Sequence, residues 1–453
     1  MKTLDLARFF NPLEVLEPDD SRHVELDEIT CARRTLYDVA RVIRSSRSAT
    51  LQMVTGLPGS GKSTLLNGLQ GVFDKLDSSA LVLRRDLSLR GEIGGLPEPG
   101  ELLGLALAEL SQALCEHTRT DPAIHALLPG VQGFFAVLNP ETFGVDLASL
   151  SVRGLRERMD PHSSFTTRLR QTGQNETQEE LIPRARYAIS ELMEALGEAS
   201  GRSEIVLILD GLEKVPREFA SETERERHHR AAKALYASWV PSFALPCHLI
   251  VTAPPGLYSV ESLARYQGNY FVSMAKIRDI ARHPFAKGED LMLEVIRKRH
   301  PEAMHLLFGD DEEWARKLVR LSGGFLRELL RLVHQGIIGN YDEASPIPDD
   351  VWNSLIDRYT HEVRSKISTD PFWVLREVNR DTAHRRLLNF PEAGHRVLWD
   401  MLDRGVLLGY QNGELWCDLH PAFVGDIRLE DSFPLPGRSP FRPPQIEAST
   451  DDE

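Results

Sequence analysis

The sequence predicts an α/β fold, in which a parallel β-sheet is covered by helices on both faces and a helical module follows. Three observations lead to this class. Fully apolar runs of strand length alternate with amphipathic helical patterns up to about residue 275. After about residue 276 the strand signals stop and helical patterns follow one another. Near the C-terminus, two β-rich runs flank Asn412-Gly413, which is a strong hairpin signal.

The predicted sheet is built from apolar runs that each end in glycine or polar residues. These runs are ATLQMVTG, SSALVLRRD, EIVLILDG and HLIVTAPPG. Helical spacing occurs between them in STLLNGLQGVFDKL, ELLGLALAELSQALCEH and TQEELIPRARYAISELMEALG. Because such apolar strands must be buried on both sides, the pattern favours a parallel sheet between two helical layers.

The C-terminal part is predicted to be mainly helical. DLMLEVIRKRH, EEWARKLVRLS and GFLRELLRLVHQGIIG have helical spacing and form a predicted lid. The pattern restarts near 346–350 as short helices and closes with the hairpin in VLLGYQNGELWCDLHP. Helices that end in a hairpin suggest a winged-helix-like domain.

We therefore divide the chain into five predicted segments. They are an N-terminal helical lead-in (1–46), an α/β core (47–275) with an insertion (118–174), a helical lid (276–345), a winged-helix-like domain (346–428) and a disordered tail (429–453).

Composition narrows the function classes. The 453 residues suffice for two to four modules, and the formal charge of −14 argues against broad binding to nucleic acid or anionic membranes. Cys31, Cys115, Cys247 and Cys417 are far apart, so we expect buried thiols in a reducing compartment. The sequence shows neither a membrane-spanning run nor a signal-peptide pattern. We expect a cytoplasmic protein.

The strongest motif is GLPGSGKST at 56–64, which satisfies G-x-x-x-x-G-K-[ST]. Its glycines let backbone N–H groups curl around phosphates, and the following helix adds its positive end. Lys62 would reach the β- and γ-phosphates, and Ser63 would ligate Mg²⁺. The predicted nucleotide contacts are Gly56, Pro58, Gly59, Ser60, Gly61, Lys62, Ser63 and Thr64.

A Mg²⁺ complex also needs an acid at the end of a neighbouring strand. Asp210 fits, because it ends the buried run EIVLILD, where ligands of open α/β sheets bind. Its alternative role is to cap a loop. The next residue is Gly211, where many motor-type ATPases have a glutamate. Glu213 could polarise the attacking water, or it could be a solvated partner of Lys214. Slow or conditional hydrolysis is the expectation.

Three further residues are candidates for sensing the nucleotide. Thr252 ends the run HLIVT and would face the γ-phosphate. Arg327, one turn into the helix after Gly323-Gly324, could move onto the γ-phosphate. His420 could fold back to a nucleotide diphosphate. Each also has a structural interpretation, as a strand end, an exposed helix arginine and a structural histidine, respectively.

Together these residues resemble the AAA+/STAND branch of P-loop ATPases. GLPGSGKST corresponds to Walker A, and LILDGLEK is similar to the NACHT variant of Walker B, although Lys214 replaces its last acid. SGGFLRELLRL resembles the sensor-2 helix of initiator-type AAA+ proteins, which places Arg327 at sensor 2 and Thr252 at sensor 1. The hairpin end resembles that of STAND proteins, where a histidine, here His420, contacts ADP. The order of motifs is similar to a group of bacterial ATPases.

The resemblance implies ATP, Mg²⁺ and a signalling or anti-phage switch that acts through self-association or a protein effector. A neighbouring subunit could complete the site, with Arg217 and Arg225 as nominal arginine candidates. The alternative is an initiator-like DNA-binding ATPase. Between 346 and 428, however, ten Lys or Arg stand against thirteen Asp or Glu, a net of −3, with only Arg380, Arg385 and Arg386 as a basic cluster. A small-molecule phosphotransferase would need an acceptor pocket, which only 118–174 could supply.

Overall fold

The computed structural model describes residues 3–12, 14, 16, 20–87, 99–119, 129–131, 134, 178–212, 222–257, 265–309, 311–367, 372–390 and 392–430. Most of the predicted insertion (118–174) and nearly all of the predicted tail (429–453) lie outside these residues. Glu213, Lys214 and Arg217 also lie outside them.

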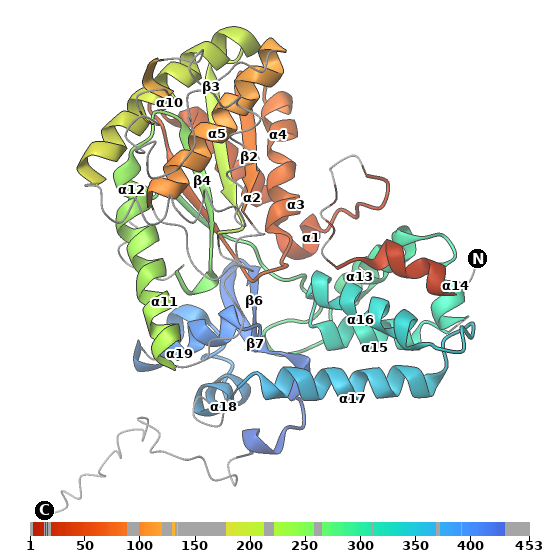
Figure 1. The fold of residues 1–453 in the computed structure, drawn as a ribbon. Helices are drawn as coiled ribbons and strands as arrows, with labels where there is room; N and C mark the ends of the chain where they lie inside the picture. The colour runs from red at the N-terminus through yellow and green to blue at the C-terminus, as the bar shows by residue number, and fades with distance from the viewer. Residues whose placement is uncertain are drawn as a thin grey trace, which may run out of the picture.

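A five-stranded parallel sheet forms the centre of the N-terminal half (Figure 1). Its strand order is β2-β3-β4-β1-β5, and each neighbouring pair is parallel. The strands are β1 (Leu51–Thr55), β2 (Ala80–Asp86), β3 (Glu204–Asp210), β4 (His248–Ala253) and β5 (Gly268–Phe271). The four predicted strands are confirmed. β5 was not predicted, because GNYF is short and pairs only along one edge of the sheet.

Helices cover both faces of the sheet, as predicted. One face packs on α5 (Pro99–Thr118) and α10 (Gln178–Ser200) through the odd-numbered residues of β3, such as Leu207. The other face packs on α2 (Ala32–Ser45), α3 (Lys62–Asn67) and α4 (Leu69–Lys75) through the even-numbered ones, such as Ile208. This alternation puts Asp210, which follows Ile208 by two positions, on the α3 face.

A helical lid follows β5, in agreement with the predicted order. Its helices are α13 (Ala286–Arg299), α14 (Ala303–Phe308), α15 (Glu313–Ser322) and α16 (Leu326–Gly339). The amphipathic patterns place Leu329, Leu332 and Val333 in its core. The N-terminal turn η1 (Thr3–Phe10) packs on α16, with Leu6 and Phe10 buried in the same core.

The C-terminal module consists of α17 (Asp349–Ser365), α18 (Phe372–Arg380) and α19 (Glu392–Asp403), followed by the strands β6 (Leu407–Asn412) and β7 (Glu414–Leu419). The two strands form the predicted antiparallel hairpin around Gly413, whose φ of 87° suits the turn. A single hydrophobic core joins this module to the lid, from Leu329 through Trp352 to Leu408.

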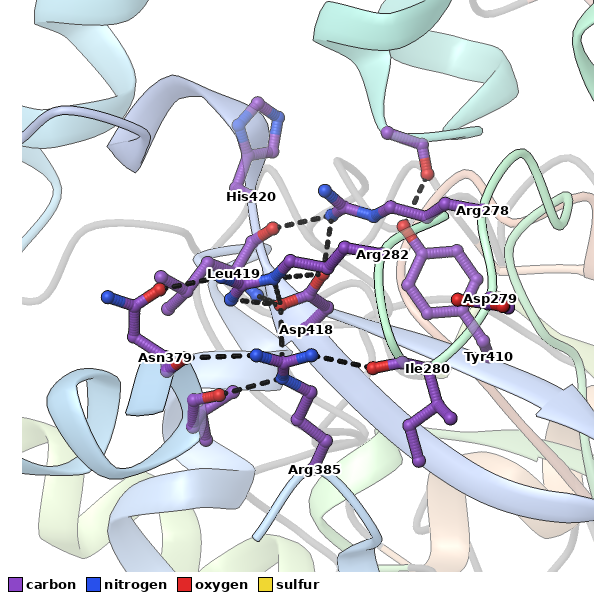
Figure 2. Close-up of polar contacts among 12 residues, drawn as sticks. Arg278, Asp279, Ile280, Arg282, Asn379, Arg385, Tyr410, Asp418, Leu419 and His420 are labelled. Atoms are coloured by element: carbon purple, nitrogen blue, oxygen red, sulfur yellow. Dashed lines mark hydrogen bonds and ion pairs between the residues drawn. The ribbon is translucent and has the colours of Figure 1, made fainter. Parts of the chain in front are cut away.

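A buried charge cluster fixes the hairpin to the chain that enters the lid (Figure 2). We call Arg278, Arg282, Arg385 and Asp418 the Asp418 cluster. Asp418 is fully buried, and its carboxylate accepts hydrogen bonds from Arg282 Nη2 at 2.7 Å and Nε at 3.1 Å. Arg278 Nη2 lies 3.2 Å from the same carboxylate and donates to the Leu419 carbonyl at 2.8 Å. The lid entrance and β7 are therefore joined by ion pairs as well as apolar packing.

Arg385 belongs to this cluster rather than to a basic surface patch. Its guanidinium donates to the carbonyls of Val378, Ile280 and Asn379 at 2.6–2.9 Å, and only 5% of the residue is exposed. The expectation that Arg385 joins Arg380 and Arg386 at the surface is wrong, because the carbonyls around it draw the side chain inward.

The sequence predicts buried cysteine thiols and no membrane-spanning segment. All four cysteines are free thiols, and Cys31 is partly exposed while the other three are buried. Within the described ranges, we find no helix with the length and apolar character needed to cross a bilayer.

Candidate nucleotide-binding site

The phosphate loop lies between β1 and α3, as the sequence predicts. α3 begins at Lys62, which is 3% exposed. Lys62 Nζ donates hydrogen bonds to the carbonyl oxygens of Gly56 at 2.8 Å and Leu57 at 2.9 Å. The lysine is thereby held across the mouth of the loop, where its ammonium group can reach phosphate oxygens.

Arg327 of the lid lies directly against this loop. A Cβ placed on Gly59 would meet Arg327 Nε at 2.7 Å and Cδ at 2.8 Å, and the φ of Gly59 is +94°. Glycine is thus required at this position both for the backbone conformation and for the close approach of the arginine. The structure therefore brings the predicted sensor arginine to the phosphate loop.

A cavity of about 840 Å³ opens beside the loop. Its floor is the phosphate loop from Gly59 to Leu65, and one wall is the N-terminal segment around Leu26, Asp27 and Thr30. The opposite wall comes from the lid; the lid residues are Val295, Arg299, Leu326, Arg327 and Leu330. Such a volume, lined by both apolar and polar side chains, is typical of a small-molecule site.

Ion pairs tie the N-terminal wall to the lid. Glu14 accepts hydrogen bonds from Arg22 Nη2 at 2.7 Å and from Arg299 Nη1 at 3.0 Å. Arg299, on α13, is only 4% exposed. Glu14, Arg22 and Arg299 all line the cavity, so this ion-pair network forms part of its wall.

Asp210 and Thr252 lie side by side at the ends of β3 and β4. Both are fully buried, and Thr252 Oγ1 accepts a hydrogen bond from the Gly211 N–H at 2.8 Å. Arg84 on β2 donates to Asp210 Oδ2 from Nη2 at 2.6 Å and from Nε at 3.0 Å. Its Nη1 donates to Asn67 Oδ1 on α3 at 2.6 Å. Asp210 is therefore connected through Arg84 to the helix that follows the phosphate loop.

The donor set fits a magnesium–triphosphate group. Among the residues that the structure describes, the buried atoms Ser60 Oγ and Asp210 Oδ1 have no hydrogen-bond partner. A phosphate oxygen could accept from the serine, and a metal-bound water could donate to the carboxylate. Ser63 lines the cavity, as a metal ligand must. Lys62, Ser60 and Arg327 would hold the phosphates, and Ser63 and Asp210 would hold Mg²⁺.

The other catalytic candidates are not all placed by the structure. Glu213 and Arg217 lie outside the described residues, so their predicted roles stay predictions. Arg225 belongs to α11 (Glu222–Ala234), whose backbone alone is described at that position.

His420 is not among the residues that line the cavity. It is 2% exposed, its Nδ1 accepts a hydrogen bond from the Ala422 N–H at 3.1 Å, and its Nε2 lies 3.0 Å from the Tyr359 hydroxyl. Burial lowers the pKa of His420 to about 3, so the ring is neutral. In this conformation both ring nitrogens have partners inside the C-terminal module, and the predicted contact with a nucleotide diphosphate stays a prediction.

A different residue brings the C-terminal module to the nucleotide-binding core. Asp403, at the end of α19, accepts a hydrogen bond on Oδ1 from the Gly256 N–H at 3.1 Å, just beyond β4. Burial raises the pKa of Asp403 to about 7, although Lys62 and Arg404 act in the opposite direction. The contact therefore involves a carboxyl group whose charge changes near neutral pH.

We expect Asp403→Asn to alter the pH dependence of stability. Because the folded pKa lies above the unfolded value of 3.8, Asp403 stabilises the fold below about pH 4 and loses this contribution as pH rises towards 7. The asparagine does not titrate, so the variant should gain about 2 to 3 kcal/mol relative to wild type between pH 5 and pH 8. Urea denaturation at both pH values measures this change. A constant difference between the two proteins would contradict the assignment.

Sequence reasoning missed Arg84, Asp86 and the N-terminal wall. Arg84 and Asp86 end the run ALVLRRD, and the register that pairs Asp86 with Asp210 could have indicated them. For the wall around Leu26 and Thr30 the sequence offers no comparable signal, since the segment is positioned by contacts with distant residues such as Ser273, whose hydroxyl donates to the Thr30 carbonyl.

Comparisons with known proteins yield distant structural likenesses only. No family model matches the sequence, and neither does any curated protein. The ORC2 protein of Aeropyrum pernix, solved as ADPNP–ADP complexes, is similar at 11% identity and a TM-score of 0.37, over 92% of this chain and 93% of that one. The RuvB Holliday junction branch migration motor of Thermotoga maritima is similar at 12% identity and a TM-score of 0.33, over 89% and 97% of the two chains.

Because these TM-scores are low, the fold assignment rests on the chain itself. The parallel sheet in the order β2-β3-β4-β1-β5, the phosphate loop after β1 and the acid at the end of β3 form a P-loop NTPase fold. The predicted fold class is thereby confirmed.

Proposed function

We propose that the protein is an ATP-binding and ATP-hydrolysing regulatory switch of the AAA+/STAND type. The observation that carries this proposal is the contact between lid and phosphate loop, in which Arg327 lies against Gly59. An arginine at that position would touch the γ-phosphate of ATP and lose that contact in ADP. The lid would therefore adopt different positions in the two states.

Nucleotide binding is supported by the chemistry of the cavity. Lys62, Ser60 and Ser63 line the cavity and supply donors for phosphates and a hydroxyl for Mg²⁺. The buried Asp210, which is not among the residues that line the cavity, would supply the acid. The apolar side chains of Leu26 and Leu330 line the opposite walls, between which a flat base would fit. We propose adenine nucleotides with Mg²⁺ as the natural ligands, as the resemblance to AAA+ proteins implies.

A signalling role is supported by how the lid is joined to the C-terminal module. The Tyr410 hydroxyl of β6 donates to the Gly323 carbonyl at 2.6 Å, four residues before Arg327. The Asp418 cluster fixes the neighbouring strand to the lid entrance. A lid that moves with the nucleotide would therefore carry the winged-helix-like module with it, and would change a surface seen by a protein effector or by other copies of the chain.

The setting we propose is bacterial signalling or anti-phage defence, with slow or conditional hydrolysis because Gly211 follows Asp210. The alternative, an initiator-like DNA-binding ATPase, would use the same nucleotide site. Since Arg385 is buried, that alternative would need a basic surface other than the one predicted near 380–386.

The test replaces Arg327 by alanine. We expect about 10-fold weaker binding of a non-hydrolysable ATP analogue and nearly unchanged binding of ADP, because one charge-assisted hydrogen bond to the γ-phosphate is lost. Isothermal titration calorimetry measures both affinities. Arg358→Ala, an exposed arginine of α17, is the matched control.

Equal losses for the two nucleotides would contradict a sensing role for Arg327.

A second measurement concerns self-association. Light scattering gives the molar mass of the same samples in ADP, in the ATP analogue and without nucleotide. A switch that acts through self-association predicts a mass that depends on the nucleotide, whereas an unchanged mass leaves an effector as the partner.

A further inference from the structure

Asp86 is an acid at the end of the strand next to Asp210. β2 and β3 are parallel, and Asp86 pairs with Asp210 in their register. Residues in register project from the same face of a sheet, so Asp86 lies on the face that carries α3 and the phosphate loop. It lines the 840 Å³ cavity together with Lys62 and Ser63, and its side chain is 44% exposed.

A guanidinium group connects the two acids. Arg84 Nη2 lies 2.6 Å from Asp210 Oδ2 and 3.7 Å from Asp86 Oδ2. Both N–H groups that Arg84 directs to Asp210 go to the same oxygen, Oδ2. Oδ1 of Asp210 is thus left for the metal shell, while Asp86, unlike Asp210, is among the residues that line the cavity.

The catalytic requirement of this site is a carboxylate that orients water. Hydrolysis of a triphosphate needs a group that places a water molecule in line with the γ-phosphorus and accepts its proton. Gly211 directly follows Asp210 and cannot supply this group. A carboxylate at the end of the neighbouring strand can, because the carboxyl ends of parallel strands converge on one crevice.

We propose that Asp86 is the residue that orients and deprotonates the attacking water. The inference rests on the proposed ATPase function and names a catalytic residue for it. The water oxygen forms a bond to the γ-phosphorus while the bond from that phosphorus to the β,γ-bridging oxygen breaks. ADP leaves with the bonding electron pair, and the water proton passes to the Asp86 carboxylate and then to solvent.

The experiment compares Asp86→Asn with Glu213→Gln, which removes the candidate that the sequence suggests. Asparagine keeps the shape of the side chain but cannot accept the proton. We expect a single-turnover hydrolysis rate at least about 100-fold below wild type, with Kd for ATP within about threefold. Asp86→Glu should recover part of the rate, because it restores the carboxylate. The control Asp342→Asn, an exposed residue outside the cavity, should turn over like wild type.

Three results would overturn the inference. One is an Asp86→Asn protein that hydrolyses ATP at the wild-type rate, and another is a 100-fold loss confined to Glu213→Gln. The third is a wild-type protein that binds ATP and never hydrolyses it. Failure of wild type and all variants to bind ATP is a different result, since it would contradict the proposed function itself.

Discussion

Lys62→Ala is expected to weaken ATP binding by at least about 100-fold, because the lysine is the main cationic partner of the β- and γ-phosphates. In the structure its ammonium group already lies at the mouth of the phosphate loop, bound to the carbonyls of Gly56 and Leu57. Alanine removes the charge and leaves these carbonyls facing the phosphates. Fluorescence titration with a labelled ATP analogue measures the loss.

The control for this variant is Lys317→Ala, an exposed lysine of α15 that lies away from the cavity. It should bind nucleotide like wild type. Circular dichroism must show that Lys62→Ala is folded, since unfolded protein would imitate the expected loss. A folded Lys62→Ala protein with wild-type affinity would exclude the phosphate loop as the binding site.

Asp418→Asn is expected to lower the free energy of unfolding by about 3 to 5 kcal/mol, because it removes the only carboxylate within 4.0 Å of Arg278, Arg282 and Arg385 among the described residues. The side chains of Arg278 and Arg385 are 15% and 6% exposed, so water cannot replace the lost partner. Chemical denaturation followed by tryptophan fluorescence measures the effect, since Trp416 lies two residues away.

Glu414→Gln provides the matched control in the same hairpin. Glu414 accepts a hydrogen bond from Arg386 at 2.8 Å, but both side chains are about half exposed. Its removal should cost less than about 1 kcal/mol. If Asp418→Asn were no more destabilising than Glu414→Gln, the Asp418 cluster would not hold the hairpin to the lid.

Much of this molecule could be predicted from local patterns. The four apolar strands, the lid helices and the hairpin at Gly413 follow from periodicity and turn chemistry, which act over neighbouring residues. The phosphate loop could be predicted for the same reason, since its glycines and Lys62 are consecutive. Asp210 needed only the rule that ligands lie at the carboxyl ends of strands, and the structure places it beside Thr252.

What could not be predicted depends on contacts between distant segments. β5 is a strand because an edge of β1 is available to GNYF, which has little strand character alone. Asp403 reaches Gly256 across 147 residues, and Arg84 reaches Asp210 across 126. For His420, the resemblance predicts a distant contact with the nucleotide. In the structure, its ring nitrogens contact Tyr359 and Ala422 of its own module instead.

The central claim is that the cavity between the phosphate loop, the N-terminal segment and the lid binds a magnesium–ATP complex. Calorimetric titration of the folded wild-type protein with ATP, once with Mg²⁺ and once with EDTA, tests it most directly. We predict saturable uptake of one nucleotide per chain, and weaker uptake when Mg²⁺ is removed. No detectable uptake of ATP, ADP or GTP under either condition would contradict the account.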